Sequence, residues 1–167
     1  MNTARGPALV LGFLYLCFLA YLAMSSGQLP ERLATHFDGS GQPNGWMSRS
    51  FHLWFILIFG LTFPFIVAVV LFFARFLPNH LINIPRRDYW LATERRDDTF
   101  AYLFRQALWF ACISVCFVAG IHILIVRANL QLPAHLSTPL LFGVAGGFLA
   151  ALIVWCVALV LHFRRVV

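Results

Sequence analysis

The segment QLPERLATHFDGSGQPNGWMSR, residues 28–49, is polar and rich in turn residues, and it separates two strongly apolar runs. It contains the turn dipeptides Asp38-Gly39 and Asn44-Gly45, whose residues tolerate positive φ angles. Several turns within so few residues predict a compact, ordered loop and not a flexible tether.

The composition of the chain predicts a membrane protein. Of its 167 residues, 61% are hydrophobic and 11% are charged, whereas about a quarter of the residues in soluble domains are charged. Such a chain has too little polar surface to cover a globule in water, and a lipid bilayer is the solvent that suits it.

The fold class expected is therefore an all-α integral membrane protein with four membrane helices in a single domain that covers residues 1–167. A membrane helix needs about 20 mainly apolar residues. The helices are expected at about residues 8–26, 51–77, 94–127 and 139–162, and the third includes a helical extension before the membrane segment.

Local signals predict further details of these elements. Pro30 suits the first turn of a helix, so residues 31–37 are expected to form a short amphipathic helix. Pro64 lies near the centre of the second apolar run, where it should kink the helix as packing requires or act as a hinge. Thr93 is a suitable N-cap for a helix that begins at Glu94.

The arginines predict the orientation. An arrangement with both termini in the cytoplasm places nine arginines inside and leaves Arg32, Arg49 and Arg127 outside, in agreement with the positive-inside rule. The segment 28–49 is then extracytoplasmic. The arginines lie next to apolar runs, which indicates charge flanking a membrane and not a nucleic-acid surface. The inside set consists of Arg5, Arg75, Arg86, Arg87, Arg95, Arg96, Arg105, Arg164 and Arg165.

The pattern LP-x5-HF-x3-G-x-P-x-GWMSR within residues 29–49 resembles the signature loop of a bacterial domain of unknown function. That domain also forms the N-terminal part of SdpI-type toxin-immunity membrane proteins. The segment NIPRRDYWLATERR, residues 83–96, resembles a second segment at similar spacing in uncharacterised members. The resemblance implies a multi-pass protein of the bacterial cytoplasmic membrane, without assigning a role to the loop residues.

The segment 28–49 also holds the predicted ligand-binding residues. A chain this apolar needs few residues to connect two helices, and long loops in compact domains are usually functional or disordered. A histidine can donate or accept a proton near neutral pH, and an adjacent carboxylate can hold its ring or a ligand cation. Trp46 with Pro43 and Phe37 can form a ledge for a peptide or lipid, or the aromatic groups can anchor the chain among head groups. The predicted ligand-binding residues are His36, Phe37, Asp38, Gly41, Pro43 and Trp46.

Four histidines are placed towards the outer side by this topology: His36, His52, His122 and His135. Together they could ligate zinc or copper, although their spacing is irregular and single histidines bonded to nearby backbone are the alternative. A stripe of small residues, Gly143, Gly147 and Ala151, is predicted to pack closely on another helix, within the chain in preference to a dimer.

No Ser/His/Asp grouping, phosphate loop or zinc-protease motif occurs in the sequence, so an enzyme is not predicted. Two classes of function stay open. The first is a binding or immunity-like membrane protein whose outer loop meets a peptide toxin, another peptide or a lipid. The second is an accessory subunit of a larger membrane complex, and a weaker third is a small metal-handling or carrier protein.

Overall fold

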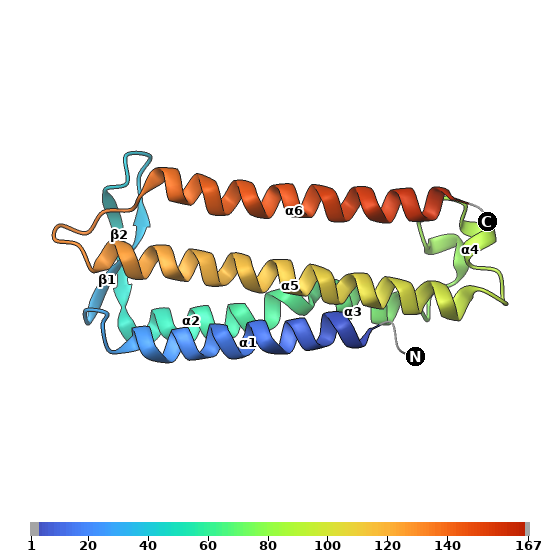
Figure 1. The fold of residues 1–167 in the computed structure, drawn as a ribbon, viewed down its shortest axis with the longest axis horizontal. Helices are drawn as coiled ribbons and strands as arrows, with labels where there is room; N and C mark the ends of the chain where they lie inside the picture. Colours follow the sequence, from blue (N-terminus) through green and yellow to red (C-terminus); the bar gives the residue numbers. More distant parts are fainter. Residues whose placement is uncertain (1–3, 166–167) are drawn as a thin grey trace.

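The computed structural model describes residues 4–165, in which four long helices lie side by side and a small hairpin covers one end of them (Figure 1). Four spans are long and apolar enough to cross a membrane, which confirms the predicted number. They are α1 (Arg5–Ser26), α2 with α3 (Arg49–Thr62 and Ile66–Ala74), α5 (Arg96–Asn129) and α6 (Thr138–Arg164).

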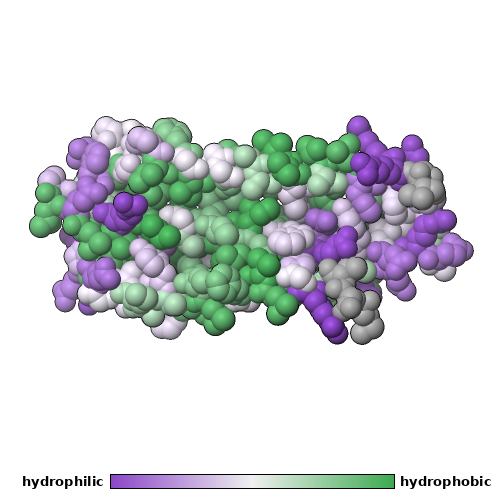
Figure 2. Space-filling model, viewed as in Figure 1, coloured by the Kyte–Doolittle hydropathy of each residue, from purple (hydrophilic) through white to green (hydrophobic). Residues whose placement is uncertain are grey.

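The surface of the molecule agrees with this interpretation. Hydrophobic residues form a broad band around the middle of the face shown in Figure 2, and hydrophilic residues gather at both ends. Many large apolar side chains of the membrane helices are exposed in the isolated chain, including Phe142 at 71% and Phe13 at 65%. A bilayer provides the apolar contact that these side chains lack in water.

Helix α5 lies at the centre of the bundle, and the other membrane helices pack around it. Ala107, Ala111 and Ser114 follow one face of α5, and each is completely buried. Small side chains let neighbouring helix backbones approach closely. The main core joins Phe18 and Leu22 of α1 to residues of α2 and α5.

Pro64 interrupts the second span, as its sequence position predicts. The segment between α2 and α3 is a short 3-10 turn, η1 (Phe63–Phe65), and Pro64 is buried in it. Proline has no backbone N–H, so the carbonyl of Gly60, four residues earlier, loses its helical partner. The Tyr15 hydroxyl of α1 donates to that carbonyl at 3.3 Å.

The chain between α3 and α5 contains only short helical turns, η2 (Asn79–Leu81) and α4 (Arg87–Trp90). The prediction that Thr93 caps a helix beginning at Glu94 is wrong, since α5 begins at Arg96 and its N-cap residue is Arg95. The N–H groups of both arginines donate to the Ala92 carbonyl, which closes a turn before the helix.

Helix α6 packs mainly on α5 and is the least buried of the four spans. Phe117 of α5 stacks on Phe148 of α6 with ring centroids 4.4 Å apart, and the Trp155 indole donates to the Gln106 carbonyl at 2.9 Å. Large side chains therefore make much of this contact, and Val144 of α6 also approaches Gly120 of α5 closely.

The predicted close packing of the stripe Gly143, Gly147 and Ala151 on another helix of the chain does not occur. A Cβ placed at either glycine would meet no atom within 4 Å. The three residues instead line an open apolar groove of about 610 Å³, between α6 and the pair α1 and α5. The aromatic contacts on α5 hold α6 at a distance that leaves the stripe uncovered.

Candidate functional site

A two-stranded antiparallel hairpin, β1 (Arg32–Phe37) and β2 (Pro43–Ser48), caps the end of the bundle where α1 ends and α2 begins (Figure 1). The prediction of a helix over residues 31–37 is therefore wrong. Leu33 and Phe37 share a helix face, but residues four apart also share a face of a strand. The local apolar pattern fits both, and the partner strand β2 decides between them.

Asp38 closes the hairpin turn with its side chain. One carboxylate oxygen accepts from the Ser40 hydroxyl at 2.7 Å, from the Ser40 N–H at 2.9 Å and from the Gln42 N–H at 3.0 Å. The Ser40 hydroxyl and then the Gln42 N–H hold the pKa of Asp38 below its ordinary value. Asp38 thus organises its own turn. Among the described residues it makes no hydrogen bond to the His36 ring, which is the first of the two roles that the sequence suggests for it.

Gly41 is fixed beneath the loop that joins α5 to α6. Its φ of 83° lies in the left-handed region that favours glycine. Its carbonyl accepts from the Leu136 N–H at 2.9 Å, and a Cβ at this position would lie 2.3 Å from the Leu136 carbonyl oxygen. The glycine is therefore required by the close contact of two loops and is not presented to a ligand.

Apolar residues attach the hairpin to the helix ends. Leu29 and Leu33 are buried against Val126 of α5, and Phe37 packs on a second buried cluster that includes Leu136. The Arg49 guanidinium donates to the Leu29 carbonyl at 3.0 Å. The hairpin is thus a rigid lid on the bundle, and Phe37 belongs to its attachment.

Asn129, at the end of α5, pairs with the outer edge of β1. Its side-chain oxygen accepts from the Ala34 N–H at 2.7 Å, and its side-chain amide donates to the Ala34 carbonyl at 2.8 Å. Residues opposite each other in an antiparallel pair either exchange both hydrogen bonds or direct them away from each other. Ala34 is opposite Trp46, so the backbone groups of Trp46 also point away from β1.

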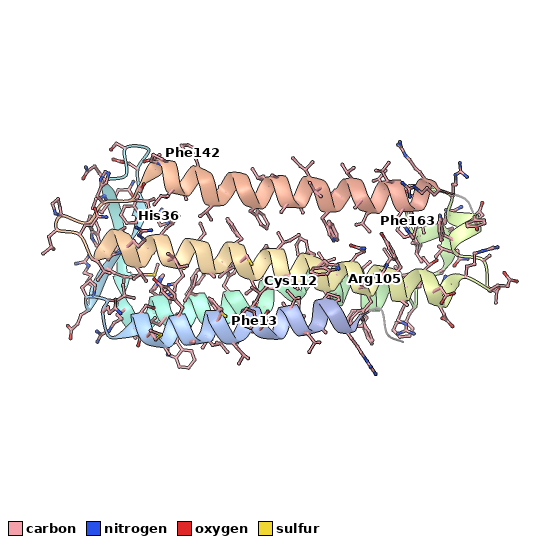
Figure 3. All side chains as sticks on the ribbon, viewed as in Figure 1. Phe13, His36, Arg105, Cys112, Phe142 and Phe163 are labelled. Atoms are coloured by element: carbon pink, nitrogen blue, oxygen red, sulfur yellow. The ribbon has the colours of Figure 1, made fainter. Side chains whose placement is uncertain are left out.

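The outer edge of β2 at Trp46 is consequently open. Within residues 4–165, no hydrogen bond from another element reaches the N–H or the carbonyl of Trp46. Its side chain is 49% exposed, and the Arg32 guanidinium lies 6.0 Å from the ring centroid. His36, which lies on the hairpin (Figure 3), is also exposed, whereas Pro43 is half-buried.

A buried chain of polar side chains lies at the same end of the bundle and joins three helices. The Nε2 atom of His122 in α5 is 3.0 Å from the Ser25 hydroxyl of α1, and its Nδ1 atom is 3.1 Å from Nε2 of His52 in α2. His122 is completely buried, and His52 and Ser25 are each 2% exposed. The Tyr21 ring meets His122 edge-on.

One pair of histidine tautomers satisfies every hydrogen bond of this chain. With Nε2 of His122 protonated, the Ser25 oxygen accepts from it, and the Ser25 hydroxyl donates to the Leu22 carbonyl at 3.2 Å. Nδ1 of His122 then accepts from Nε2–H of His52. The chain cross-links three helices, and the buried serine is not presented to a substrate.

The structure divides the four histidines predicted to ligate a metal. It brings His52 and His122 together, whereas His36 lies on β1 and His135 lies in the loop beside Gly41. Among the residues described, no group of three or more His, Cys, Asp or Glu side chains is placed to hold a metal ion. The predicted four-histidine site is therefore not formed, because the irregular spacing places the rings on different elements.

Sequence reasoning missed Ser25 and Asn129. Each is a single polar residue at the end of an apolar run, where a polar residue is unremarkable, and each finds its partner more than 90 positions away. The sequence does place His52 and His122 within apolar runs and Ser25 at the end of another run, at a similar depth in the predicted membrane. This combination is the signal that could have predicted the hydrogen bonds among them.

Comparison with family models matches residues 13–61, from the middle of α1 to near the end of α2, to a domain of unknown function (DUF1648). The hairpin is thus the centre of the matched region. Searches of curated proteins and of solved structures return no significant match. The chain is defined by these findings as a multi-pass membrane protein that contains a region similar to this domain.

Proposed function

We propose that this chain is a non-enzymatic protein of the bacterial cytoplasmic membrane that binds an extended peptide at the outer edge of β2. The observation that carries the proposal is the open edge at Trp46, where two backbone groups have no partner among the residues described. An exposed strand edge is a template for another strand. Peptides that add to such an edge gain main-chain hydrogen bonds, and adjacent side chains provide specificity.

The side chains near this edge suit a peptide ligand. The half-exposed Trp46 ring offers apolar contact beside the backbone groups, and Arg32 places a positive charge near the same ring. His36 offers a hydrogen-bonding group on the neighbouring strand. Of the six residues predicted to bind a ligand, His36, Pro43 and Trp46 keep that role, whereas Asp38, Gly41 and Phe37 shape and attach the hairpin.

The distribution of arginines supports an orientation with the hairpin outside the cell, where a peptide toxin would arrive. Nine arginines flank the end opposite the hairpin in the proposed orientation, and three lie on the hairpin side. The resemblance of residues 29–49 to the loop of SdpI-type proteins supports an immunity-like role for this binding. In that role, the protein intercepts a peptide at the outer membrane surface.

A peptide library tests strand addition directly. Random peptides displayed on phage are selected on the protein in lipid nanodiscs, with counter-selection on empty nanodiscs. Trp46→Ala removes the ring and keeps the backbone N–H, whereas Trp46→Pro also removes that N–H. Proline is tolerated where a strand N–H faces away from its partner, so both variants are expected to keep their melting temperatures.

The selected peptides should bind the wild type, bind Trp46→Ala more weakly and lose binding to Trp46→Pro. Peptides that bind Trp46→Pro as well as they bind Trp46→Ala would contradict strand addition. Failure to select any peptide from a library of extended sequences would contradict peptide binding itself. Asn44→Ala, a change at another exposed residue of β2, serves as the control and should leave binding unchanged.

The open groove beside α6 favours a second candidate function, an accessory subunit of a membrane complex. The uncovered stripe Gly143, Gly147 and Ala151 suits the close approach of a partner helix. Purification in mild detergent should then yield a stoichiometric membrane partner that Gly147→Leu releases. If the wild type and Gly147→Leu both purify without a partner, the result favours peptide binding over the accessory-subunit function.

A further inference from the structure

An apolar groove with two arginines lies between α3 and α5, at the end of the bundle opposite the hairpin. Its volume of about 640 Å³ is within the range of small-molecule sites. Four of its six apolar lining residues are phenylalanines. The apolar lining consists of Leu71, Phe72, Phe76, Phe100, Ala101 and Phe104.

Arg75, at the end of α3, contributes a guanidinium without a polar partner. It lies over the Phe76 ring, 5.5 Å from the centroid. Within residues 4–165, this guanidinium makes no hydrogen bond and no ion pair. A cation at the edge of a membrane helix is stabilised by an anion, and no carboxylate of the described residues is close enough to Arg75 to form an ion pair.

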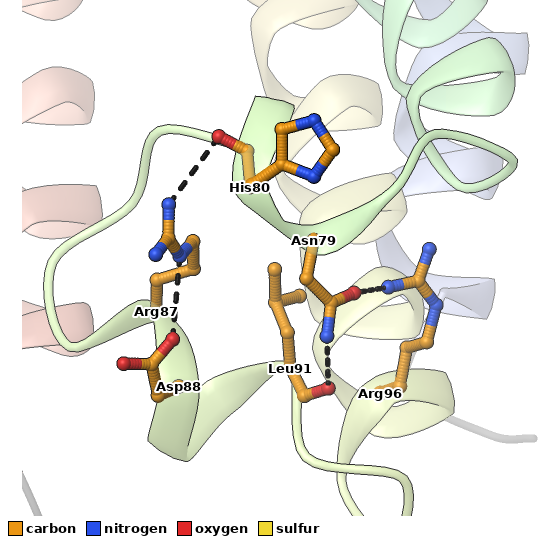
Figure 4. A network of polar contacts seen from close by, with 6 residues as sticks. All are labelled: Asn79, His80, Arg87, Asp88, Leu91 and Arg96. Atoms are coloured by element: carbon orange, nitrogen blue, oxygen red, sulfur yellow. Dashed lines mark hydrogen bonds and ion pairs between the residues drawn. The ribbon is translucent and has the colours of Figure 1, made fainter.

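Arg96, at the start of α5, holds the groove in shape. Its guanidinium donates to the carbonyls of Arg75 at 2.8 Å and Leu77 at 3.0 Å, and it also binds the side-chain oxygen of Asn79 (Figure 4). These bonds satisfy carbonyls at the C-terminal end of α3. A guanidinium has five N–H donors, so two remain for a ligand, and the three existing bonds fix its position.

The charges of the groove favour an anion. Asp97 also lines it, so two guanidiniums stand against one carboxylate. Asp97 is exposed and makes no ion pair with another described residue, whereas Arg96 is held in place. The remaining positive charge lies where the aromatic wall ends and the polar end of the molecule begins, which is the depth of lipid phosphates.

We propose that this groove binds an anionic phospholipid, with the phosphodiester at Arg75 and Arg96 and an acyl chain along the phenylalanines. The unpaired Arg75 guanidinium favours a ligand with a negative charge, and the apolar lining of the groove favours a ligand with a hydrocarbon chain. A soluble phosphate would use only the arginines and would leave the wall uncovered. This site is independent of the hairpin and of peptide binding.

Native mass spectrometry of the purified protein tests the proposal with mixed micelles of phosphatidylglycerol and phosphatidylcholine. Phosphatidylglycerol should be retained in preference to phosphatidylcholine. Arg75→Gln should weaken retention of phosphatidylglycerol about fivefold, since one interfacial arginine contributes about that factor. Arg164→Gln removes an equal charge from an exposed arginine at the same end of the molecule and should leave retention unchanged.

A second variant tests the groove without changing charge. Ala101→Phe places a ring in the groove and should displace phosphatidylglycerol, while the melting temperature shows that the fold persists. Excess glycerol 3-phosphate should not displace the lipid, because it lacks the chain. Equal retention of both lipids, an equal loss in Arg75→Gln and Arg164→Gln, or displacement by glycerol 3-phosphate would each overturn the proposal.

Discussion

At the scale of single residues, side chains satisfy backbone groups that the local fold leaves open. Asp38 accepts three hydrogen bonds within its turn, Asn129 pairs with both backbone groups of Ala34, and Tyr15 replaces the N–H that Pro64 lacks. Unsatisfied backbone groups are costly, most of all away from water. Each of these polar residues is therefore explained by a backbone group at a strand edge, a turn or a helix break.

Acid should loosen the hairpin turn through Asp38. The pKa of this carboxyl is lowered from its ordinary value of 3.8 in the folded protein. The stabilisation is thus complete above about pH 4 and is lost as the pH falls through the folded value. Hydrogen–deuterium exchange of residues 38–42, corrected for intrinsic rates, should show a loss of protection below pH 4 that Asp38→Asn abolishes. Asp98→Asn is the control and should keep the acid-induced loss of protection. If Asp38→Asn also keeps this loss, or if Asp98→Asn abolishes it, protonation of Asp38 is not its cause.

Ser25→Ala should destabilise the bundle more than Ser26→Ala. Both hydroxyls bond the carbonyl three residues earlier, but only the Ser25 hydroxyl also bonds His122. Its loss leaves a buried imidazole nitrogen without a partner, at a cost of about 1–3 kcal/mol. Unfolding in detergent, followed by circular dichroism, should show this difference between the two variants. Equal melting temperatures would mean that the histidine chain contributes no net stability.

At the scale of elements, the break between α2 and α3 is held by α1. Tyr15 bonds the carbonyl freed by Pro64, and the Phe18 ring lies directly against Gly60. A Cβ at Gly60 would be 2.7 Å from the tip of that ring, which is buried in the main core. The small residue and the proline together let the second span bend around α1.

Gly60→Ala should therefore destabilise the protein, although alanine has the higher helix propensity. The propensity gain is at most about 1 kcal/mol, whereas overpacking of a core costs about 1–3 kcal/mol. Gly12→Ala in α1 is the matched control, because a Cβ there meets nothing within 4 Å. A lower melting temperature for the Gly60 variant alone is expected, and equal values for both variants would show that Phe18 can move aside.

At the scale of the whole molecule, the two ends of the bundle differ in structure and charge. The hairpin and the α5–α6 loop cover one end, whereas both described ends of the chain and the arginine-rich turns around α4 lie at the other (Figure 1). The bundle is also uneven from side to side, because α5 is central and α6 is attached along one side. These asymmetries separate the proposed peptide edge, lipid groove and partner groove into three places.

Cysteine labelling tests the proposed orientation. In a background without Cys17, Cys112, Cys116 and Cys156, a cysteine at Ser40 in the hairpin turn should react with an impermeant maleimide added to whole cells. A cysteine at Asp98 near the start of α5 should react only after the membrane is opened. Labelling of both from the same side would contradict four crossings, and the reverse pattern would invert the orientation.

The sequence by itself determined the membrane class, the number of helices and the break at Pro64. Each of these depends on a property of the segment itself, either the length of an apolar run or the missing N–H of a proline. Contacts with other segments do not change such a property. Tertiary structure decided that residues 32–37 are a strand, that Ser25, His52 and His122 meet, and that the stripe on α6 stays open. These outcomes depend on partners outside the segment itself, from the adjacent strand β2 to helices more than 90 positions away, and an apolar or polar pattern in one segment does not identify its partner.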